Sequence, residues 1–357
     1  MRHIPADALT ALGEAIVRGM GGAAGEAALV ARHLVDANLA GHDSHGIGML
    51  PSYVAGIRAG KLRLGAELET LRDRGPVLLF DGQRGFGQVM ARAAMERGVE
   101  RARRDGLAAV GLRNSFHIGR IGAWGEICAA AGFVSLHFVN VRSRPIVAPF
   151  GGSDARFSTN PVCVALPATD DTPRVVLDMA TSQIALGKAR VAYHKGVPVP
   201  PGSLIDHTGA ATDDPAVMFE DPKGALRPMG LHKGYALAVI CELLGGGLTG
   251  GGTWGSAEPE PDLIVNNMTT VILDPDLFGA GAELRRDIDA FTAWVKASPP
   301  APGVEAVMVP GDPERRTRDE RLRNGIPMDA GNWAALCAAA AEAGLDDGAV
   351  RGIVGEV

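Results

Sequence analysis

Apolar residues recur at helical spacing near the beginning of the chain. Leu9, Leu12 and Ile16 lie three or four positions apart, and a second run with similar spacing follows Gly21-Gly22. Such spacing places the apolar side chains on one face of a helix, and a pair of glycines interrupts it. The pattern predicts two helices within residues 6–40.

The pattern changes between residues 75 and 140, where short apolar runs alternate with amphipathic stretches. Short apolar runs bounded by turn residues are typical of strands, and their alternation with helices favours an α/β layer. The predicted strands cover 77–80, 107–112 and 133–139, and the predicted helices cover 88–104 and the surroundings of Trp124.

The second half of the chain continues in the same manner, with a stiff proline-rich loop at 198–202 and a Pro- and Gly-rich connector at 298–312. One predicted helix follows directly after a short strand, so that Thr181 and Ser182 would cap its beginning. The predicted strands are 175–177 and 269–273. The predicted helices are a stretch that follows Ser182 and continues through Val191, 231–244, 282–297 and 331–343.

Composition adds limits on the class of protein. The 357 residues suggest two domains or one elaborated domain, and 46% hydrophobic with 21% charged residues is ordinary for a globular protein. A net charge of −6 argues against a nucleic-acid partner. No apolar run approaches the length of a membrane helix and no leader pattern is visible, so we expect a cytoplasmic protein without membrane contact. The four cysteines, which form no Cys-x-x-Cys pair, are expected to be reduced thiols.

The segment 41–53 concentrates potential chemistry in one short run. It contains His42, Asp43, Ser44, His45 and Tyr53, and its glycines and proline exclude the interior of a helix. Imidazoles are suited to proton transfer near neutral pH. The H-x-x-H spacing has no nearby third ligand or glutamate base, so we predict no metal site.

A glycine-rich stretch at 245–250 fits the pattern G-x-G-x-x-G. The dinucleotide-binding mechanism requires this pattern between a strand and a helix, because the helix N-terminus must meet the pyrophosphate. Here the glycines follow a predicted helix, so we interpret them as a flexible loop that ends that helix.

Several other polar segments allow two interpretations each. The run 178–182 and Lys233, in the first turn of a predicted helix, could hold a phosphate or serve only as a cap and a solvated cation. His117 stands beside Asn114, Ser115 and Arg120 after a strand, which suits either a ligand loop or a structural histidine. The segment 310–318 is predicted as a turn, and its Arg315, Arg316 and Arg318 could meet a 2′-phosphate or form a solvated face.

Taken together, these segments resemble the malate/L-lactate dehydrogenase family of non-Rossmann NAD(P)-dependent oxidoreductases. Ureidoglycolate dehydrogenase, 2,3-diketogulonate reductase and cyclic-imine reductases belong to the same family. The resemblance runs from about residue 5 to residue 345, and it is strongest toward hydroxycarboxylate dehydrogenases. The matching segments are 41–53, 115–122, 157–161, 178–188, 194–202, 232–235 and 294–299.

The resemblance implies an α/β fold with a mixed sheet flanked by helices, which binds NAD or NADP without a Rossmann motif. It also implies a mainly helical domain from the two chain ends (1–72 plus 282–357) and an α/β domain (73–281) that binds cofactor and substrate. A homodimer with its active site near the interface is the expected assembly, and a small 2-oxo or 2-hydroxy acid is the expected partner.

The resemblance also assigns site residues. It makes His45 and His117 the catalytic pair, and we expect Ser44, Met49, Tyr53 and Arg120 at the substrate. The residues expected at the cofactor are His45, Gly119, Arg120, Ile121, Ser143, Asp178, Met179, Ala180, Thr181, Lys233, Asn267, Gly311, Asp312, Pro313 and Glu314.

The chain departs from the family at one position. Many members carry an arginine where this chain has Met49, and that arginine would bind the substrate carboxylate as a bidentate partner. Methionine cannot do so, and its flexible thioether favours a larger or more apolar substrate tail. Arg120 is therefore our first candidate for the carboxylate.

The expected reaction interconverts 2-oxo acids and 2-hydroxy acids by hydride transfer. His45 would serve as general acid or base with an ordinary imidazole pKa of about 6.5, and His117 would orient the carbonyl, although the two could exchange roles. Asp43 or Asp178 would fix a tautomer. The competing interpretations are a cyclic-imine reductase and, more remotely, a non-catalytic ligand-binding protein.

Overall fold

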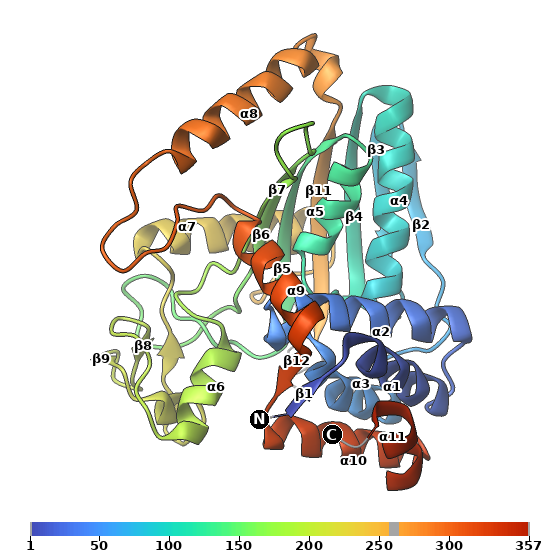
Figure 1. Ribbon diagram of the computed structural model, residues 1–357, viewed down its shortest axis with the longest axis vertical. Coiled ribbons are helices and arrows are strands. Elements are labelled where there is room, and N and C mark those ends of the chain that lie inside the picture. Colours follow the sequence, from blue (N-terminus) through green and yellow to red (C-terminus); the bar gives the residue numbers. More distant parts are fainter. Residues whose placement is uncertain (1, 257–263, 356–357) are drawn as a thin grey trace.

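The structure, a computed structural model, describes residues 2–256 and 264–355 (Figure 1). Residues 1, 257–263, 356 and 357, which belong to the two predicted domains, lie outside the described part. Within the described ranges, no helix is long and apolar enough to span a membrane.

A mixed sheet forms the centre of the molecule. Its strands follow the order β2-β3-β4-β11-β5-β6-β7, in which only β3 and β4 run parallel and all other neighbours are antiparallel. The α/β class with a mixed sheet is therefore confirmed. The strands are β2 (Glu69–Arg74), β3 (Val77–Asp81), β4 (Leu107–Phe116), β5 (Val134–Arg142), β6 (Val162–Leu166), β7 (Val175–Met179) and β11 (Val265–Leu273).

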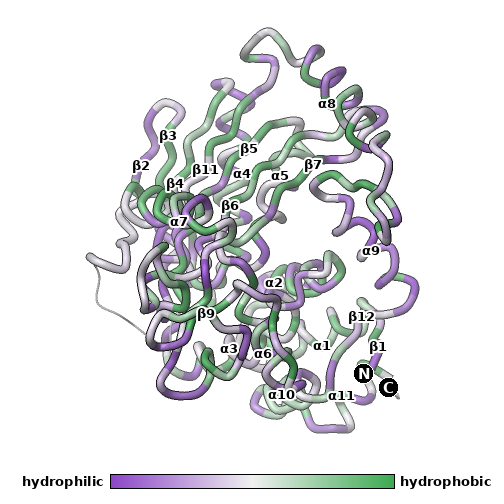
Figure 2. Tube along the Cα trace, turned by 90° about the vertical axis from the view of Figure 1, so that its left-hand side faces the viewer, coloured by the Kyte–Doolittle hydropathy of each residue, from purple (hydrophilic) through white to green (hydrophobic). Residues whose placement is uncertain are grey.

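Helices cover both faces of this sheet. On one face, α4 (Gly87–Asp105) packs against β4 and α5 (Gly122–Ala130) packs against β5 and β6, around buried Trp124. On the other face lie α7 (His232–Cys241) and its π-helical continuation Glu242–Leu248. The central strands run between these layers and are largely hydrophobic along the trace (Figure 2), as burial on both faces requires.

The two chain ends meet in a helical layer at the end of the sheet where β4 finishes (Figure 1). Strand β1 (Arg2–Ile4) pairs antiparallel with β12 (Ile326–Met328), and one buried apolar cluster joins the surrounding helices. This confirms a helical part built from both ends. Its helices are α1 (Ala6–Gly19), α2 (Ala24–Leu39), α3 (Leu50–Arg58), α10 (Ala330–Glu342) and α11 (Asp347–Val354).

Helix α8 (Gly281–Lys296) lies at the opposite end of the molecule from the helical layer (Figure 1). Its Asp289 accepts hydrogen bonds from Thr169 and Thr172, which precede β7. The predicted domain limits are 1–72 plus 282–357 and 73–281. They assign α8 to the helical domain, although α8 lies far from the other helices of that domain. These limits remain a prediction.

A small lobe projects beside the sheet and was not predicted as a unit. It contains α6 (Leu186–Lys195), the short 3₁₀ helix Pro215–Met218 and a three-stranded sheet, and it has its own apolar cluster. The strands are β8 (Leu204–Ile205), β9 (Ala211–Thr212) and β10 (Ala225–Leu226).

Three predicted elements differ from the structure. The helix predicted to follow Ser182 begins only at Leu186, after an irregular segment. The glycines 245–247 do not form a flexible loop, because the π-helix extends through them to Leu248; they still follow a helix, as the rejection of a Rossmann motif requires. The arginine-rich run after residue 310 is not a turn but helix α9 (Asp312–Asn324).

Candidate functional site

The histidine loop is held in place by the end of α2. The side chain of Asn38 accepts a hydrogen bond from the Ile47 amide (2.8 Å) and donates one to Asp43 Oδ1 (2.6 Å). Both terminal nitrogens of Arg321 from α9 also donate hydrogen bonds to the Asp43 carboxylate (2.6 and 2.9 Å). A Cβ on Gly46 would lie 2.3 Å from Asn38 Oδ1, so this position requires glycine. These contacts fix the two 3₁₀ turns, Asp43–His45 and Ile47–Met49.

The loop brings His45 against His117, as the resemblance implied for a catalytic pair. His45 Nδ1 lies 3.2 Å from His117 Nε2, and the two rings stack with centroids 5.3 Å apart. His117 comes from the segment directly after β4, so two distant parts of the chain form the pair. Behind it, Tyr53 Oη from α3 lies 2.7 Å from His117 Nδ1.

The expected ordinary pKa of His45 is not what the structure gives. Burial lowers the pKa of His45 to about 4; Asp178 opposes this change, whereas His42 and Arg120 add to it. The pKa of His117 is also lowered, by burial and then by His45 and His33. Both imidazoles are therefore neutral at pH 7.

An ion-pair cluster lies next to the histidines. Arg120, only 3% exposed, donates to Glu126 (2.7 Å) and stands 3.6 Å from Asp178, whose other contact is the Gly122 amide (2.9 Å). Its Nη1 has no hydrogen-bond partner among the described residues. Arg120 is thus already paired with carboxylates, which a substrate carboxylate would have to share. The negative charge of Asp178 opposes the fall in the pKa of His45, whereas Asp43 is bound by Asn38 and Arg321.

The first turn of α9 approaches the same cluster. Glu314 lies 3.2 Å from His42 Nε2, and His42 lowers its pKa. Asp312 is bound by Lys296 (2.8 Å) and Arg315. Gly311 has φ of +97° and abuts the backbone at Arg174 and Val176, so the turn 311–314 is anchored to the beginning of β7. This turn, which is one of the predicted cofactor segments, therefore lies close to two other predicted cofactor residues, Asp178 and Arg120.

Thr181 and Ser182 do not cap a helix. Thr181 donates to the carbonyl groups of Thr159 and Asn160, and Ser182 donates to that of Ile184. Helix α6 begins only at Leu186, five residues after Thr181. The Thr181 carbonyl accepts from the Met229 amide. This contact brings 178–181 near the first turn of α7, where Lys233 is exposed.

The remaining predicted residues lie in different surroundings. Ser44 is exposed beside Gly187 of α6, Ser143 is half-buried after β5, and Met49 packs against the helical core. Asn267 is fully buried; its side chain accepts from the Asn114 amide and donates to Asn140. Tyr53 is also buried, on the side of His117 away from His45.

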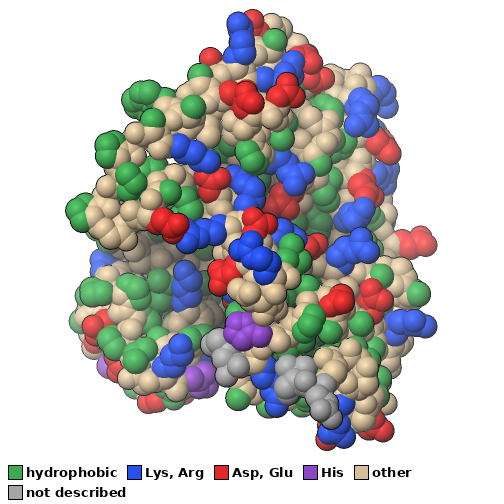
Figure 3. All heavy atoms as spheres, in the orientation of Figure 1, with side chains coloured by type: hydrophobic (Ala, Val, Ile, Leu, Met, Phe, Trp, Pro, Cys, Tyr) green, Lys and Arg blue, Asp and Glu red, His purple; other side chains and the backbone are tan. Residues whose placement is uncertain are grey.

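Arg315, Arg316 and Arg318 of α9, the three arginines considered for a 2′-phosphate, are paired inside the chain. Arg315 contacts Asp312 and the Arg174 carbonyl, Arg316 contacts Glu305, and Arg318 contacts Asp36. On the face seen in Figure 3, basic and acidic side chains are accordingly intermixed over α9. None of these pairs is buried enough to exclude competition by a phosphate.

Three side chains near the histidines were missed by the sequence analysis. Gln88 of α4 donates to Tyr53 Oη (2.7 Å), His33 of α2 accepts from the Arg120 amide (3.2 Å), and Glu126 of α5 pairs with Arg120. All three belong to helices whose amphipathic pattern gives no sign of function. Only their position in the fold reveals them.

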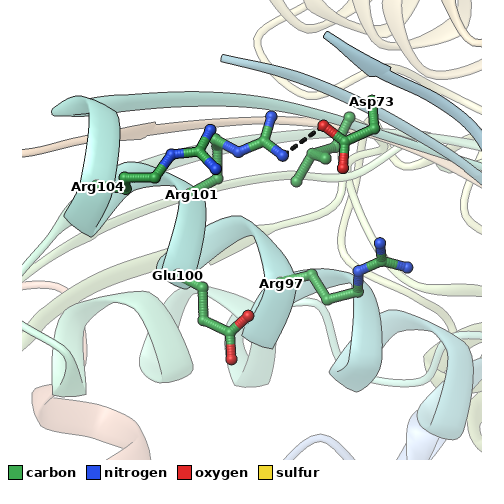
Figure 4. Close-up of a pocket in the computed structure, with 6 residues that line it drawn as sticks. Asp73, Arg97, Glu100, Arg101 and Arg104 are labelled. Carbon is green, nitrogen blue, oxygen red and sulfur yellow. Dashed lines mark hydrogen bonds and ion pairs between the residues drawn. The ribbon is translucent and has the colours of Figure 1, made fainter. Parts of the chain in front are cut away.

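A cavity of about 270 Å³ lies away from the histidines, between α4 and strands β2 and β3 (Figure 4). Its charged lining includes Arg97, Glu100 and Arg104, and Arg101 pairs with Asp73 at 2.5 Å. Arg101 is roughly 20 Å along α4 from the helix end that meets His117. The described residues include no cluster of His, Cys, Asp or Glu that could hold a metal ion.

Comparison with known proteins identifies the family. The family model for malate/L-lactate dehydrogenase matches residues 4–337. Hydroxycarboxylate dehydrogenase B of Escherichia coli K12 is 53% identical over 336 residues, which cover 94% of this chain and 92% of that protein. L-lactate dehydrogenase of Cupriavidus necator is 44% identical over 290 residues, which cover 81% of this chain and 83% of that protein.

Solved structures agree with these relatives. An E. coli structure assigned to a malate/lactate dehydrogenase superposes with a TM-score of 0.95 at 51% identity, over 99% of this chain and 98% of that one. Sulfolactate dehydrogenase of Methanocaldococcus jannaschii gives 0.84 at 29% identity, over 97% and 98%. The fold and site thus define an oxidoreductase that acts on a hydroxy acid. The chain belongs to the malate/L-lactate dehydrogenase family.

Proposed function

We propose that the chain is an NAD(P)-dependent oxidoreductase that interconverts 2-oxo acids and 2-hydroxy acids, with His45 as the general acid and base. The observation that carries this proposal is the stacked pair of neutral imidazoles, His45 and His117, with nitrogens 3.2 Å apart. In a family of dehydrogenases, such a pair supplies the proton transfer that must accompany movement of a hydride.

The residues around Asp178 fit a nicotinamide cofactor. The buried Nη1 of Arg120 lies 3.6 Å from Asp178 but makes no hydrogen bond within the described residues, and such a donor suits an acceptor group of a ligand. A Cβ at Gly119 would collide with His33, and a Cβ at Gly122 would collide with Arg120. The backbone at these two glycines therefore packs directly against the side chains of the cluster. A bound nicotinamide would supply or accept the hydride. Arg120, Asp178, Thr181, Lys233 and the turn 311–314 would hold the cofactor.

The chain's own groups handle the proton. A neutral His45 can accept the proton of the substrate hydroxyl in the oxidation direction, and the same group returns it in reduction. His45 retains partial solvent exposure, whereas His117 is 7% exposed. His45 is therefore the member of the pair that meets the substrate, with Ser44 next to it.

The substrate carboxylate requires a cation, and Arg120 remains our candidate. Its charge is shared with Glu126 and Asp178, so the carboxylate would have to displace or join one of them. Met49 lies at the edge of the helical core, where it offers an apolar contact. We propose a 2-oxo acid with an apolar tail as the preferred class of substrate.

We also propose that two copies form a homodimer, as the resemblance implied. Ile240, Leu243 and Leu248 are 45%, 53% and 68% exposed along α7 and its continuation. Large apolar side chains along one exposed helical face favour a protein partner. Light scattering at micromolar concentration would give twice the chain mass, and a monomer would reject the proposal. The expected cytoplasmic location stays a prediction.

The test of catalysis compares His45→Ala and His117→Ala with His194→Ala, in which the exposed histidine of α6 is changed. We expect the two site variants to lose at least a hundredfold in turnover with a 2-oxo acid, and the control to keep normal turnover. Near-normal turnover in His45→Ala would refute the assignment. NADH binding, followed by fluorescence, separates loss of chemistry from loss of cofactor.

A panel of substrates decides between the remaining functions. Pyruvate, oxaloacetate, 2-oxoglutarate, phenylpyruvate and piperideine-2-carboxylate should each be assayed with NADH and NADPH. A preference for the cyclic imine would show that the hydride acceptor is a C=N bond and not a carbonyl group. That activity is named for a Pseudomonas syringae reductase of the same fold (TM-score 0.82, 27% identity). No binding of either cofactor would favour a non-catalytic protein.

A further inference from the structure

The segment 157–161, which precedes β6, resembles the family but is not part of the proposed site. Its Asn160 is fully buried and has φ of +28°, directly before Pro161. This φ is unfavourable for a residue with a side chain, although asparagine tolerates positive values better than most, and a following proline restricts the backbone further. A strained backbone persists only where the surrounding structure holds it in place. The contacts of Asn160 supply that restraint.

Asn160 joins three separate elements by hydrogen bonds. Its Oδ1 accepts from the Val141 amide of β5 (3.1 Å), and its Nδ2 donates to the Ala238 carbonyl of α7 (3.2 Å) and to Glu242 Oε2 (2.7 Å), at the beginning of the π-helix. Its backbone carbonyl accepts from the Thr181 hydroxyl, after β7 (3.1 Å). One residue therefore links β5, the segment after β7, and α7 with its continuation.

Each of these elements carries a residue expected at the cofactor. Ser143 directly follows β5, Thr181 follows β7, and Lys233 lies in the first turn of α7. We propose that Asn160 is a positioning residue that sets the relative placement of these three residues and thereby the affinity for a nicotinamide cofactor. This inference deepens the proposed function and rests on it for the roles of Ser143, Thr181 and Lys233.

The partners of Asn160 fix the orientation of its amide. The Val141 N–H can only donate and the Ala238 carbonyl can only accept, so Oδ1 must face Val141 and Nδ2 must face Ala238. Both hydrogens of Nδ2 are used, one on Ala238 and one on Glu242. Because Asn160 is fully buried, bulk water does not replace a partner that moves away. The side chain therefore holds β5 and α7 at one fixed separation.

Glu242 extends this network to a fourth predicted cofactor residue. Its Oε1 accepts from the Trp254 amide (2.9 Å) and from Asn140 Nδ2 (3.2 Å), and Asn140 Oδ1 accepts from Asn267 Nδ2 (2.8 Å). A Cβ on Gly245 would lie 2.5 Å from the Asn140 amide nitrogen, so the π-helix rests directly on β5. Single π-helical turns are frequent at functional sites. Here the π-helix places the Glu242 carboxylate between Asn160 and the side chains behind Asn267.

The experiment reverses the bond between Asn160 and Glu242. Asn160→Asp keeps the shape and the acceptor for Val141, but it sets two carboxylates against each other. Glu242→Gln alone sets two amide nitrogens against each other. The double variant Asn160→Asp with Glu242→Gln restores a donor and an acceptor and keeps the net charge of the unchanged protein. Asn332→Asp is the matched control, because exposed Asn332 also donates to a carboxylate, that of Asp329, at 2.7 Å.

The readout is the Kd of NADH or NADPH, whichever the unchanged protein binds more tightly, measured by fluorescence titration of folded protein. We expect Kd to rise at least tenfold in Asn160→Asp, to return to within about threefold in the double variant, and to stay unchanged in the control. With a 2-oxo acid and saturating cofactor, kcat should stay within about threefold, because the histidine loop is held by Asn38 and Arg321 and not by Asn160. A purely structural role would lower the stability to urea and leave the Kd of the folded variant unchanged.

A Kd within threefold of the unchanged protein in folded Asn160→Asp would overturn the inference, and so would a double variant that binds no better than the single one. If Asn160→Asp does not fold, Asn160→Gly decides. Glycine accepts the positive φ and keeps the backbone bond to Thr181, so its Kd should also rise at least tenfold, and an unchanged Kd would refute the role of the side chain. The proposed function fails separately: an unchanged protein that binds neither cofactor would reject it together with this inference, whereas an unaltered Kd in the variants would reject the inference alone.

Discussion

Arg120 is the residue at which structural and catalytic roles overlap most closely. Its side chain is 3% exposed and lies between Glu126 at 2.7 Å and Asp178 at 3.6 Å. The two opposite charges raise its pKa against the effect of burial, so it is cationic at any working pH. Arg120→Met would keep much of the side-chain volume and remove the charge.

The magnitude follows from the partners that the substitution leaves behind. Removing one member of a buried ion pair costs roughly 3–5 kcal/mol, because the other charge stays buried without compensation. Asp178, with its side chain 8% exposed, keeps the bond to the Gly122 amide, and Glu126 is 32% exposed and can be hydrated. We therefore expect about 3 kcal/mol, at the low end of that range.

Urea unfolding at pH 7 measures this loss, and Arg286→Met is the matched control. Arg286 pairs with Glu283 on the exposed face of α8 at 2.9 Å, so its loss should cost less than about 0.5 kcal/mol. A cost below about 1 kcal/mol for Arg120→Met would refute the account of a buried, mutually compensated cluster.

The same variant tests the carboxylate site. If Arg120 also binds the substrate carboxylate, KM for a 2-oxo acid rises at least tenfold, which corresponds to about 1.4 kcal/mol of lost binding. An unchanged KM for the 2-oxo acid in the folded variant would reject that role.

Other predictions concern pH and the loop. Because folding lowers the pKa of His33 and His137 to about 3, the folded state binds fewer protons than the unfolded state between pH 3 and 6.5. Stability is then lost as pH falls through that window, and His137→Gln should flatten the slope by up to about 1.4 kcal/mol per pH unit. With the pKa of His45 near 4, kcat/KM for oxidation should stay level to about pH 5, and a limb at pH 6.5 would contradict the neutral pair. Asn38→Ala removes the bonds to Ile47 and Asp43, and at least a tenfold loss of kcat/KM is expected; a loss below threefold would show that the loop holds without it.

The sequence was sufficient for elements whose pattern is local. The amphipathic spacing of α1, α2 and α4 and the apolar runs of the central strands predict those elements, and the family resemblance predicts the mixed sheet. Helix α9 was missed because it has no apolar face: its residues are mostly charged, and it is stabilised by pairs such as Arg318 with Asp36. The prediction that Thr181 and Ser182 cap a helix is wrong because a cap pattern is local, whereas Thr181 bonds to carbonyl groups 21 and 22 residues away.

The residues of the site also fall into two groups: those that the sequence indicates and those that only the fold reveals. His45 and His117 could be named because both lie in polar loops, one after a helix and one after a strand, and because the family resemblance assigns them as a pair. Their 3.2 Å contact, however, depends on how α2 and β4 meet. Gln88 carries no such signal, since a glutamine in an amphipathic helix is ordinary. Its place beside the histidines appears only because the fold buries it completely and places it 2.7 Å from Tyr53.

These observations together explain how a neutral histidine can serve an anionic substrate. Burial and the nearby cations lower the pKa of His45, so the free site does not hold a proton in excess. A bound carboxylate adds negative charge beside the imidazole and raises that pKa, because an opposite charge favours the protonated form. Substrate and proton should therefore bind together in the reduction direction. Isothermal titration in buffers of different ionisation enthalpy would show proton uptake on binding of a non-reactive 2-oxo acid analogue at pH 6, and none in His45→Ala.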